Sequence, residues 1–401
     1  MDASTHAKPT VFQALSFADA TAVTERDRRL LVVDATASWC APCQTMDRTT
    51  WVDANVVDWL RQHALTIQID VDAQEDLAKQ LAIRSMPTVI AFRSGEEIDR
   101  VVGAKTPAQL LEWLDGLTRG ERNVDRIRAK VSGTEAETGK KDIGGRLDLA
   151  NALLLGGELD EATAQYCWLW SHMLAHDEAY IGVRLSFMTF DMMTLAESFR
   201  PAREAFAGLR QEAADRLAGA TPHPTDRMDW LVLNRVLGEA DRNLEWFDRV
   251  RVTPGAFDLG RAVAYELEEL LLSRGRWSDA AIFYADPFAW LKEQAGMLTM
   301  DLPSMENLPE PQPDFRAIQR QMFRASAGRL YAVLLAAGRD DEARRIAEEA
   351  RKAEPSPEMV LALVSTACDA GQRKDEHRSW LDTPDVRDLP DTADVRKRLV
   401  S

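Results

Sequence analysis

Cysteine is scarce in this sequence, with four in 401 residues. A secreted protein stabilised by disulfides would carry many more, so the sequence is not typical of that class. No apolar run approaches the roughly 20 residues that a membrane-spanning helix needs. The first residues, MDASTHAKPTVFQAL, have neither a basic start nor an apolar core, so we expect no secretory signal there. These absences predict a protein of a reducing compartment, and we expect the cytoplasm.

Positive charge is also in short supply. Lys and Arg number 49 against 65 Asp and Glu, which leaves a formal net charge of -16. Such a surface repels phosphate backbones and anionic membranes, so we expect neither nucleic acid nor a membrane as the main partner. Hydrophobic residues make up 45% and charged residues 28%, which is ordinary for globular proteins. The length fits two to three domain-sized cores.

Two of the four cysteines stand together in the stretch SWCAPC, residues 38–43. This spacing suits a metal clamp, a structural disulfide or a redox-active dithiol. A tetrahedral metal site needs a second pair of ligands, and we identify none, with His63 as an isolated candidate. We therefore expect no metal. The other two cysteines, Cys167 and Cys368, are most simply small buried hydrophobes.

The residues around this pair predict alternating strands and helices. An apolar run leads directly into the pair, and a second apolar run follows Met86 and Pro87. Thr106 and Pro107 are typical of the start of a helix. We expect strands at 30–33, 65–71, 88–92 and 99–103, helices at 44–60, 75–81 and 106–117, and a turn at 93–97.

This order of elements resembles the thioredoxin family over roughly residues 10 to 120. Besides the WCxPC pair, the resemblance rests on Asp34 six residues before Cys40, on Pro87 before an apolar strand, and on a hairpin that ends at Gly103. It implies an α/β thioredoxin fold, which we place at residues 1–120. It also implies a dithiol–disulfide oxidoreductase that needs no cofactor beyond its own dithiol.

The chemistry of the pair follows from its place before a helix. The helix N-terminus would stabilise the thiolate of Cys40 and lower its pKa, which makes Cys40 the expected nucleophile. Cys43 lies one turn further and would resolve the mixed disulfide. Pro42 fits a first helical turn, because its missing N–H would have no partner there, and it is also a candidate for contact with the substrate.

The resemblance implies roles for the residues around the pair. Asp34 would be a buried carboxylate that moves the proton of the second thiol, although a solvated charge at the strand end is an alternative. Pro87 would be a cis proline, and the backbone of Met86 would bind an extended substrate segment. Trp39 directly precedes Cys40, so we expect it to shield the dithiol, with plain core packing as the alternative. Gln68 stands where thioredoxins carry a lysine, so Asp34 would be less stabilised as an anion.

Beyond residue 120 the sequence predicts helices. The polar stretch 121–144 is expected to be a linker, and residues 145–401 an all-α interaction domain. Two proline-rich stretches, 221–224 and 301–315, are expected to be loops or breaks. The segment 201–220 has one amphipathic face with five apolar positions, namely Ala202, Phe206, Leu209, Ala213 and Leu217.

A repeated pattern runs through this helical part. Residues 153–162, 271–280 and 334–343 share paired leucines, a Gly and then an Ala five residues later. The last stretch, with Gly338, Ala343, Ala350 and Pro355, resembles a tetratricopeptide repeat. Gly would end the first helix in a left-handed turn, and the small Ala would let the second helix approach. The stripe of Ala343, Ile346, Ala347 and Ala350 is expected to be buried.

Stacked helix pairs build concave surfaces that hold protein segments. Such a surface tethered to a dithiol would raise the effective concentration of captured clients. The layout resembles that of the chaperedoxins, which join the same two parts. We therefore expect protein clients with disulfides or reactive thiols, and a dithiol electron donor such as a thioredoxin reductase. The rival hypothesis is a chaperone-like holdase or assembly adaptor that uses the thioredoxin fold as a docking surface.

Overall fold

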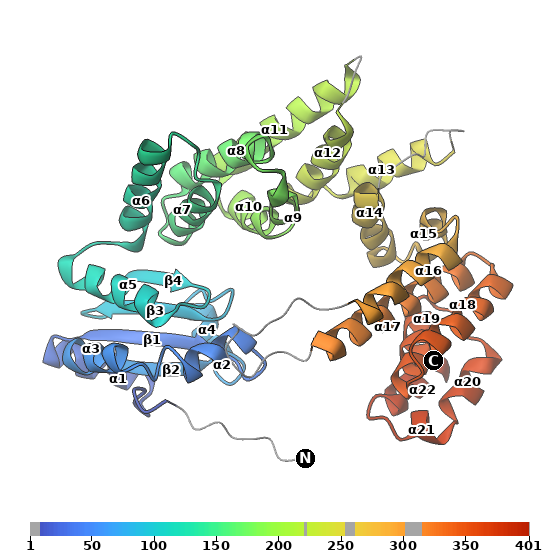
Figure 1. Ribbon diagram of the computed structural model, residues 1–401, viewed down its shortest axis with the longest axis horizontal. Coiled ribbons are helices and arrows are strands. Elements are labelled where there is room, and N and C mark those ends of the chain that lie inside the picture. The colour runs from blue at the N-terminus through green and yellow to red at the C-terminus, as the bar shows by residue number, and fades with distance from the viewer. Residues whose placement is uncertain (1–8, 220–222, 253–260, 301–314, 401) are drawn as a thin grey trace. The chain divides into compact units, whose positions relative to one another are not determined.

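A computed structural model describes residues 9–219, 223–252, 261–300 and 315–400. The chain forms two compact units, one ending at Leu209 and the other beginning at Arg210 (Figure 1). Within the described residues no helix combines the length and the apolar character that crossing a bilayer requires. Most of the two predicted proline-rich loops, residues 221–222 and 301–314, lies outside the described residues.

The first unit contains a four-stranded mixed sheet with the order β2-β1-β3-β4. Strand β1 is parallel to β2, and β3 is antiparallel to both β1 and β4. The two inner strands are buried along almost their whole length, as expected for strands covered on both faces. The four strands are β1 (Leu30–Thr36), β2 (Ala64–Asp70), β3 (Thr88–Arg93) and β4 (Glu96–Val102).

Helices cover both faces of this sheet because successive side chains of a strand point to opposite sides. Leu31 and Val33 of β1 pack in one cluster with the first and fourth helices, and Val32 packs in the other with the second, third and fifth. These helices are α1 (Phe17–Asp27), α2 (Ala41–Arg48), α3 (Ala54–His63), α4 (Glu75–Gln80) and α5 (Pro107–Arg119). The α/β thioredoxin fold predicted for the N-terminal part is confirmed.

The single helix predicted over 44–60 is wrong, because α2 and α3 are separate helices. The break centres on Trp51, whose ring is 1% exposed in the core, and ends at Asp53. The Asp53 side chain caps α3 by accepting hydrogen bonds from the amides of Asn55 and Val56 at 3.0 and 3.2 Å. Apolar periodicity continues through the break, so periodicity alone did not reveal it.

The fourth strand starts earlier than predicted, at Glu96 instead of residue 99. Ser94 and Gly95 both have positive φ, 53° and 77°, which makes a tight hairpin between β3 and β4. The residues predicted as the end of a turn therefore pair with β3, where Arg93 lies opposite Glu96.

The segment 121–144, predicted as a linker, is helical over most of its length. Helix α6 (Asn123–Thr138) buries Val124 and Val131 and ends at Gly139, which has a φ of 64°. The backbone N–H of Asn123 donates to the Asp99 carboxylate at 2.7 Å, which attaches the start of α6 to β4. Two valines seven residues apart gave too weak an apolar pattern to predict a helix, and the contacts of the folded chain decide it.

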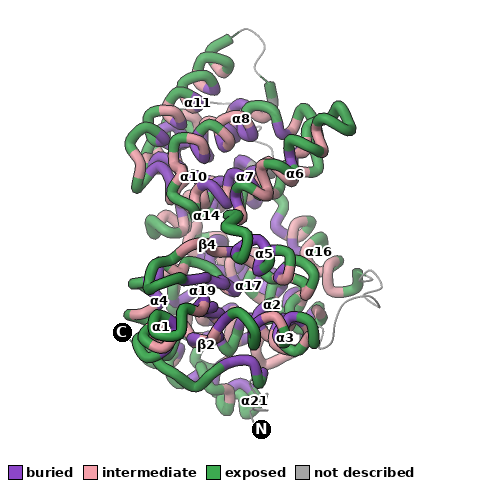
Figure 2. The backbone as a smooth tube through the Cα atoms, turned by 90° about the vertical axis from the view of Figure 1, so that its left-hand side faces the viewer, coloured by how far each residue is buried: buried purple, intermediate pink, exposed green. Residues whose placement is uncertain are grey.

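Further helices complete the first unit, and Figure 2 shows that buried residues recur along helices such as α7 and α10. These are α7 (Ile143–Leu155), α8 (Leu159–His176), α9 (Ile181–Leu185), α10 (Phe187–Ser198) and the start of α11 (Arg200–Ala218). Four of the five apolar residues predicted for one face of α11 are buried, and Leu217 is half-buried. The boundary of an interaction domain at residue 145 stays a prediction, since α6 to α10 belong to the same compact unit as the sheet.

The second unit is all-helical, as predicted. Gly275, Gly338 and Gly371 have φ between 70° and 72°, so these glycines adopt the expected left-handed conformation. The predicted stripe on α18 is fully buried. The helices of four residues or more are α12 (Pro224–Val236), α13 (Asp241–Val250), α14 (Arg261–Ser273), α15 (Trp277–Ala280), α16 (Pro287–Gly296), α17 (Phe315–Ala336), α18 (Asp340–Ala353), α19 (Pro357–Asp369), α20 (Asp375–Leu381), α21 (Pro384–Arg387) and α22 (Thr392–Val400).

Helices α17 and α19 approach each other closely at a glycine. A Cβ atom at Gly328 would lie 2.8 Å from the hydroxyl of Thr366 and 3.0 Å from the carbonyl oxygen of Ala362. A Cβ atom essentially never lies as near as 2.8 Å to another atom and rarely as near as 3.0 Å, so the absence of a side chain allows this packing. The assignment of these helix pairs as tetratricopeptide repeats stays a prediction.

Candidate functional site

The cysteine pair lies where strand β1 passes into helix α2. Cys40 is the N-cap of α2, with extended backbone angles of -81° and 95°, and its N–H donates to the carbonyl of Ala37 at 3.0 Å. The first turn of α2 therefore points its free amides at the Cys40 sulfur, and the N–H of Cys43 lies 3.2 Å from it. Amides in this position would stabilise a thiolate at Cys40 in the reduced protein, and its role as the nucleophile stays a prediction.

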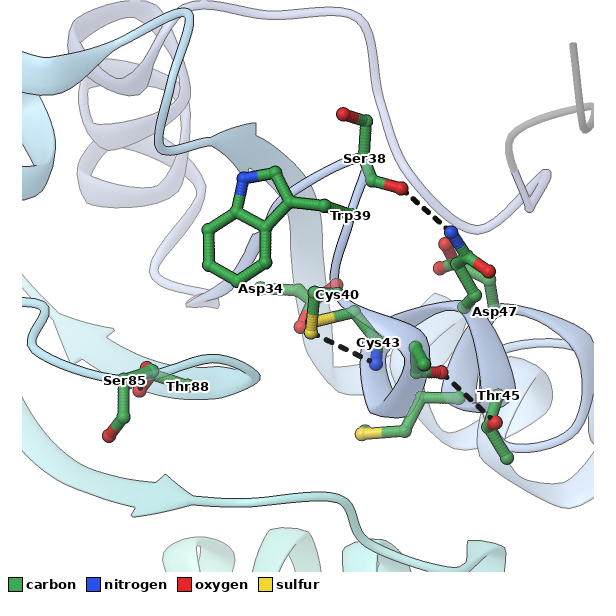
Figure 3. The surroundings of a disulfide bond; sticks show 12 residues. Asp34, Ser38, Trp39, Cys40, Cys43, Thr45, Asp47, Ser85 and Thr88 are labelled. Carbon is green, nitrogen blue, oxygen red and sulfur yellow. Dashed lines mark hydrogen bonds between the residues drawn. A yellow bond between two sulfur atoms is a disulfide. The ribbon is translucent and has the colours of Figure 1, made fainter. Parts of the chain in front are cut away.

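The two cysteines are joined by a disulfide, with their Cα atoms 5.3 Å apart (Figure 3). Both are almost completely buried, in a small apolar cluster with Ala37 and with the partly buried Val71 and Met86. The structure therefore has the pair in its oxidised form. Pro42 lies in the first turn of α2, as predicted, and is exposed.

Trp39 forms an exposed wall beside the pair. Its side chain is 65% exposed, so the alternative of plain core packing is wrong. The indole N–H donates to the Asp72 carboxylate at 2.7 Å, a contact that ties the ring to the turn after β2. An aromatic ring held in this way is suited to contact a bound protein segment. Whether it shields the dithiol stays a prediction.

A loop before β3 faces the same pair. The bond between Met86 and Pro87 is cis, which confirms the expectation for Pro87. Pro87 is buried, and its carbonyl accepts a hydrogen bond from the N–H of Gly103 at 2.9 Å. The half-buried Met86 packs against the disulfide cluster. The binding of substrate backbone by Met86 is not tested by this arrangement and stays a prediction.

Asp34 lies inside the sheet beneath the pair. It is 2% exposed and pairs in register with Gln68 of β2 and Val89 of β3, so the alternative of a solvated charge at the strand end is wrong. The side-chain amide of Gln68 donates to the Asp34 carboxylate at 3.0 Å. The same nitrogen also donates to the carboxylate of Asp47, on α2, at 2.9 Å.

Asp47 was not among the predicted site residues. Its spacing held a usable signal, since it follows Cys43 by four residues and side chains four apart on a helix share a face. That spacing could not show that Gln68, far away in sequence, connects it to Asp34. Only the register of β1 against β2 brings these three side chains together.

One possible pair of metal ligands was overlooked in the sequence. His172 and His176, four residues apart on α8, both stack on Trp168, with ring centroids 4.9 and 5.9 Å away. Two ligands do not complete a tetrahedral site. Among the described residues no group of three or more His, Cys, Asp or Glu side chains is arranged to hold a metal ion. The expected absence of a metal stays a prediction.

Comparison with known proteins identifies the same region. Residues 11–116 match the thioredoxin family model. Thioredoxin H2 of Arabidopsis thaliana is 37% identical over 84 residues, 20% of this chain and 58% of that protein. A thioredoxin-like protein of Synechocystis sp. is 36% identical over 84 residues, 21% of this chain and 77% of that protein. A solved thioredoxin of Thermus thermophilus is 22% identical, covers 27% of this chain and 88% of its own, and gives a TM-score of 0.25. The chain thus spans less than two thirds of the Arabidopsis relative's length.

Proposed function

Because the chain belongs to the thioredoxin family, we propose that it is a thiol–disulfide oxidoreductase that reduces disulfides in protein clients. The observation that carries this proposal is the Cys40–Cys43 pair, joined at the N-terminus of α2 and facing the loop with the cis Pro87. A thiolate at such a helix start is both stabilised and able to attack a disulfide.

The reaction proceeds in two exchanges. In the reduced protein, the Cys40 thiolate attacks one sulfur of a client disulfide, and the other client sulfur leaves as a thiolate. Cys43 then loses its proton and attacks the Cys40 sulfur, which forms the Cys40–Cys43 disulfide and releases the second client thiolate. Two electrons have passed to the client, and a dithiol donor such as a thioredoxin reductase returns them.

Other residues of the site act on the proton and on the client. Asp34, buried beneath the pair, is the base that accepts the Cys43 proton and passes it to solvent. Met86 binds the client backbone, as in strand addition, and Trp39 and Pro42 contact the client at the exposed side. No cofactor beyond the dithiol takes part, and we place the protein in the cytoplasm.

The helical part is proposed to recruit these clients. Left-handed glycines at the ends of helices and the buried stripe on α18 are compatible with stacked tetratricopeptide-like pairs, which build concave binding surfaces. Capture of a client near the dithiol would raise the effective concentration of that client there. The second candidate function, a holdase or assembly adaptor, uses the same surfaces without the thiol.

Trapping experiments on the full-length protein separate these functions. Wild-type protein should reduce insulin disulfides, and Cys40→Ser should not. Cys43→Ser lacks the resolving thiol, so it should hold clients as mixed disulfides in cells. Equal insulin turnover by wild type and Cys40→Ser would end the enzyme proposal. Capture of the same partners by Cys40→Ser would favour the adaptor instead.

The recruiting role needs a separate comparison. A free thioredoxin with its resolving cysteine changed to Ser should trap a broader and weaker set of clients than full-length Cys43→Ser. This difference is expected because the free domain lacks the added effective concentration. If the two proteins trap identical sets, the helices do not select clients.

A further inference from the structure

Two carboxylates share one neutral amide beneath the dithiol. The side-chain nitrogen of Gln68 lies 3.0 Å from an oxygen of Asp34 and 2.9 Å from an oxygen of Asp47. A glutamine amide carries two N–H bonds, so each carboxylate receives one of them. The three side chains come from β1, β2 and α2, and Asp47 lies one turn after Cys43.

The shared amide brings two like charges close together. Because both oxygens contact the same nitrogen, they lie less than about 6 Å apart. Two carboxylates at such a distance resist being ionised together, so the pair keeps one proton to a higher pH than a lone carboxyl would. Gln68 satisfies hydrogen bonds but adds no positive charge that could offset this repulsion.

Burial decides which carboxyl keeps the proton. Asp34 is 2% exposed, whereas Asp47, on α2, is half-buried. Desolvation disfavours the charged form of the deeper group. A proton shared by the pair would therefore reside on Asp34, and Asp47 would carry the negative charge.

We propose that Asp47, acting through Gln68, sets the pH at which Asp34 becomes a base for Cys43. This inference rests on the proposed dithiol activity and makes Asp47 and Gln68 positioning residues for the resolving step. While Asp34 holds the shared proton, it cannot accept the proton of Cys43, so the mixed disulfide persists. When Asp34 ionises, it takes that proton, and the Cys43 thiolate then displaces the client sulfur from Cys40.

Other charged groups lie on α2, on the end of β2 and in the segments that follow β2 and β4. The Arg48 guanidinium donates to the Thr45 hydroxyl at 3.4 Å, and the Lys105 ammonium donates to the carbonyl of Val102 at 2.7 Å. At the end of β2, Asp70 accepts from the amides of Asp72 and Ala73 at 2.9 and 3.3 Å, and Asp72 accepts from Trp39. All of these groups are the same in the variants compared below, so they cancel in the comparison.

Dithiobis(nitrobenzoate) separates the two steps, since attack by Cys40 releases one coloured thiolate and resolution by Cys43 releases a second. The reduced full-length protein is mixed with this reagent at a series of pH values from about 5 to 9, an interval above the ordinary carboxyl pKa of about 3.9 that includes the ordinary thiol pKa of about 8.5. The signal of protein with both Cys40→Ser and Cys43→Ser is subtracted. This removes the contribution of Cys167 and Cys368.

Asp47→Asn should move the midpoint of the second release about one pH unit lower, because it removes a like charge at this distance. Gln68→Lys should move the midpoint of the second release in the same direction, because it adds a positive charge. Asp47→Glu keeps the negative charge and should have the wild-type midpoint. The matched control is Asp58→Asn on α3, which changes the net charge equally at an exposed site and should leave the midpoint unchanged.

The outcomes distinguish this inference from the proposed function. Absence of the first release in wild type contradicts the dithiol activity itself. Two normal releases with the same second midpoint in wild type, Asp47→Asn and Gln68→Lys contradict the role of Asp47. An equal shift in Asp58→Asn does so as well, because it would reflect net charge alone. If Asp47→Asn fails to fold, as seen by circular dichroism, Gln68→Lys still decides.

Discussion

Acidification should loosen the C-terminal helices, because a neutral histidine is buried among them. His377, on α20, is 0% exposed, and burial lowers its pKa to about 4, with the nearby Lys374 charge as a smaller cause. Its Nδ1 accepts from the Lys374 N–H at 3.3 Å, so a neutral ring carries its proton on Nε2. That nitrogen lies 2.8 Å from the hydroxyl of Tyr331 on α17 and donates to it.

The size of the effect follows from the two states of the histidine. In the unfolded chain His377 has its ordinary pKa of 6.5, whereas in the folded chain the pKa is about 4. Between these two pKa values the unfolded chain therefore binds a proton at His377 and the folded chain does not. The stabilisation is present above pH 6.5 and is lost as the pH falls toward 4. Between pH 7 and 5 the free energy of unfolding should decrease by about 2 kcal/mol from this group.

Hydrogen exchange with mass spectrometry can measure this change in α19 to α22 without assuming that the whole chain unfolds together. Opening free energies at pH 7 and 5 are compared, after correction for the pH dependence of exchange itself. His377→Gln, which cannot take up a proton, should lose about 2 kcal/mol less than wild type over this interval. His172→Gln, at an exposed site on α8, is the matched control and should behave like wild type.

A proton NMR titration tests the same reasoning directly. The ring proton signal that disappears in His377→Gln belongs to His377, and its midpoint should lie near pH 4. A midpoint near 6.5 would refute the reasoning, since the ring would then be protonated as easily in the folded chain as in the unfolded chain. The same holds if wild type and His377→Gln lose equal opening free energy on acidification.

Two further predictions concern the dithiol and the helix packing. In the reduced protein Cys40 should be alkylated faster than Cys43 at neutral pH, because Cys40 caps α2 and Cys43 lies within its first turn. Mass spectrometry of partially alkylated protein measures which cysteine reacts first. Faster alkylation of Cys43 would contradict this prediction. Gly328→Ala should destabilise the protein by about 1–3 kcal/mol because its Cβ would press on Ala362 and Thr366. Gly208→Ala, on the open side of α11, should instead stabilise the protein by up to about 1 kcal/mol. Thermal unfolding measures both effects. If the unfolding curves of both variants move in the same direction, the close packing of α17 against α19 is not supported.

Much of the N-terminal part could be predicted from the sequence because its signals are local. An apolar run followed by CxxC specifies a strand that passes into a helix, and the pair then lies at the helix start whatever the rest of the chain does. The cis form of Pro87 and the burial of Asp34 were anticipated from the resemblance to the thioredoxin family, and the structure has both. The left-handed glycines of the helical part were likewise readable, since only glycine adopts that conformation without strain.

Features that depend on contacts between residues far apart in sequence were visible only in the tertiary structure. Helix α6 forms from a polar segment because Val124 and Val131 become buried and the N–H of Asn123 donates to the Asp99 carboxylate. The break between α2 and α3 depends on Trp51 entering the core of the sheet. Trp51 also packs against Phe12, and Asn123 bonds to Asp99, so each feature depends on a contact with a residue distant in sequence that no local pattern reveals.

The candidate site divides in the same way. The proposed nucleophile Cys40 and the proposed resolving thiol Cys43 could be named from the sequence, and Asp34 from the resemblance, because all three lie within ten residues of one another. The place of the second carboxylate, Asp47, beside Asp34 depends on the tertiary structure. The pairing of Asp34 with Gln68 across β1 and β2 puts the Gln68 amide between Asp34 and Asp47. A sequence states which side chains exist and how they alternate along an element, whereas the distance between charges on different elements is set only when the sheet and its helices pack.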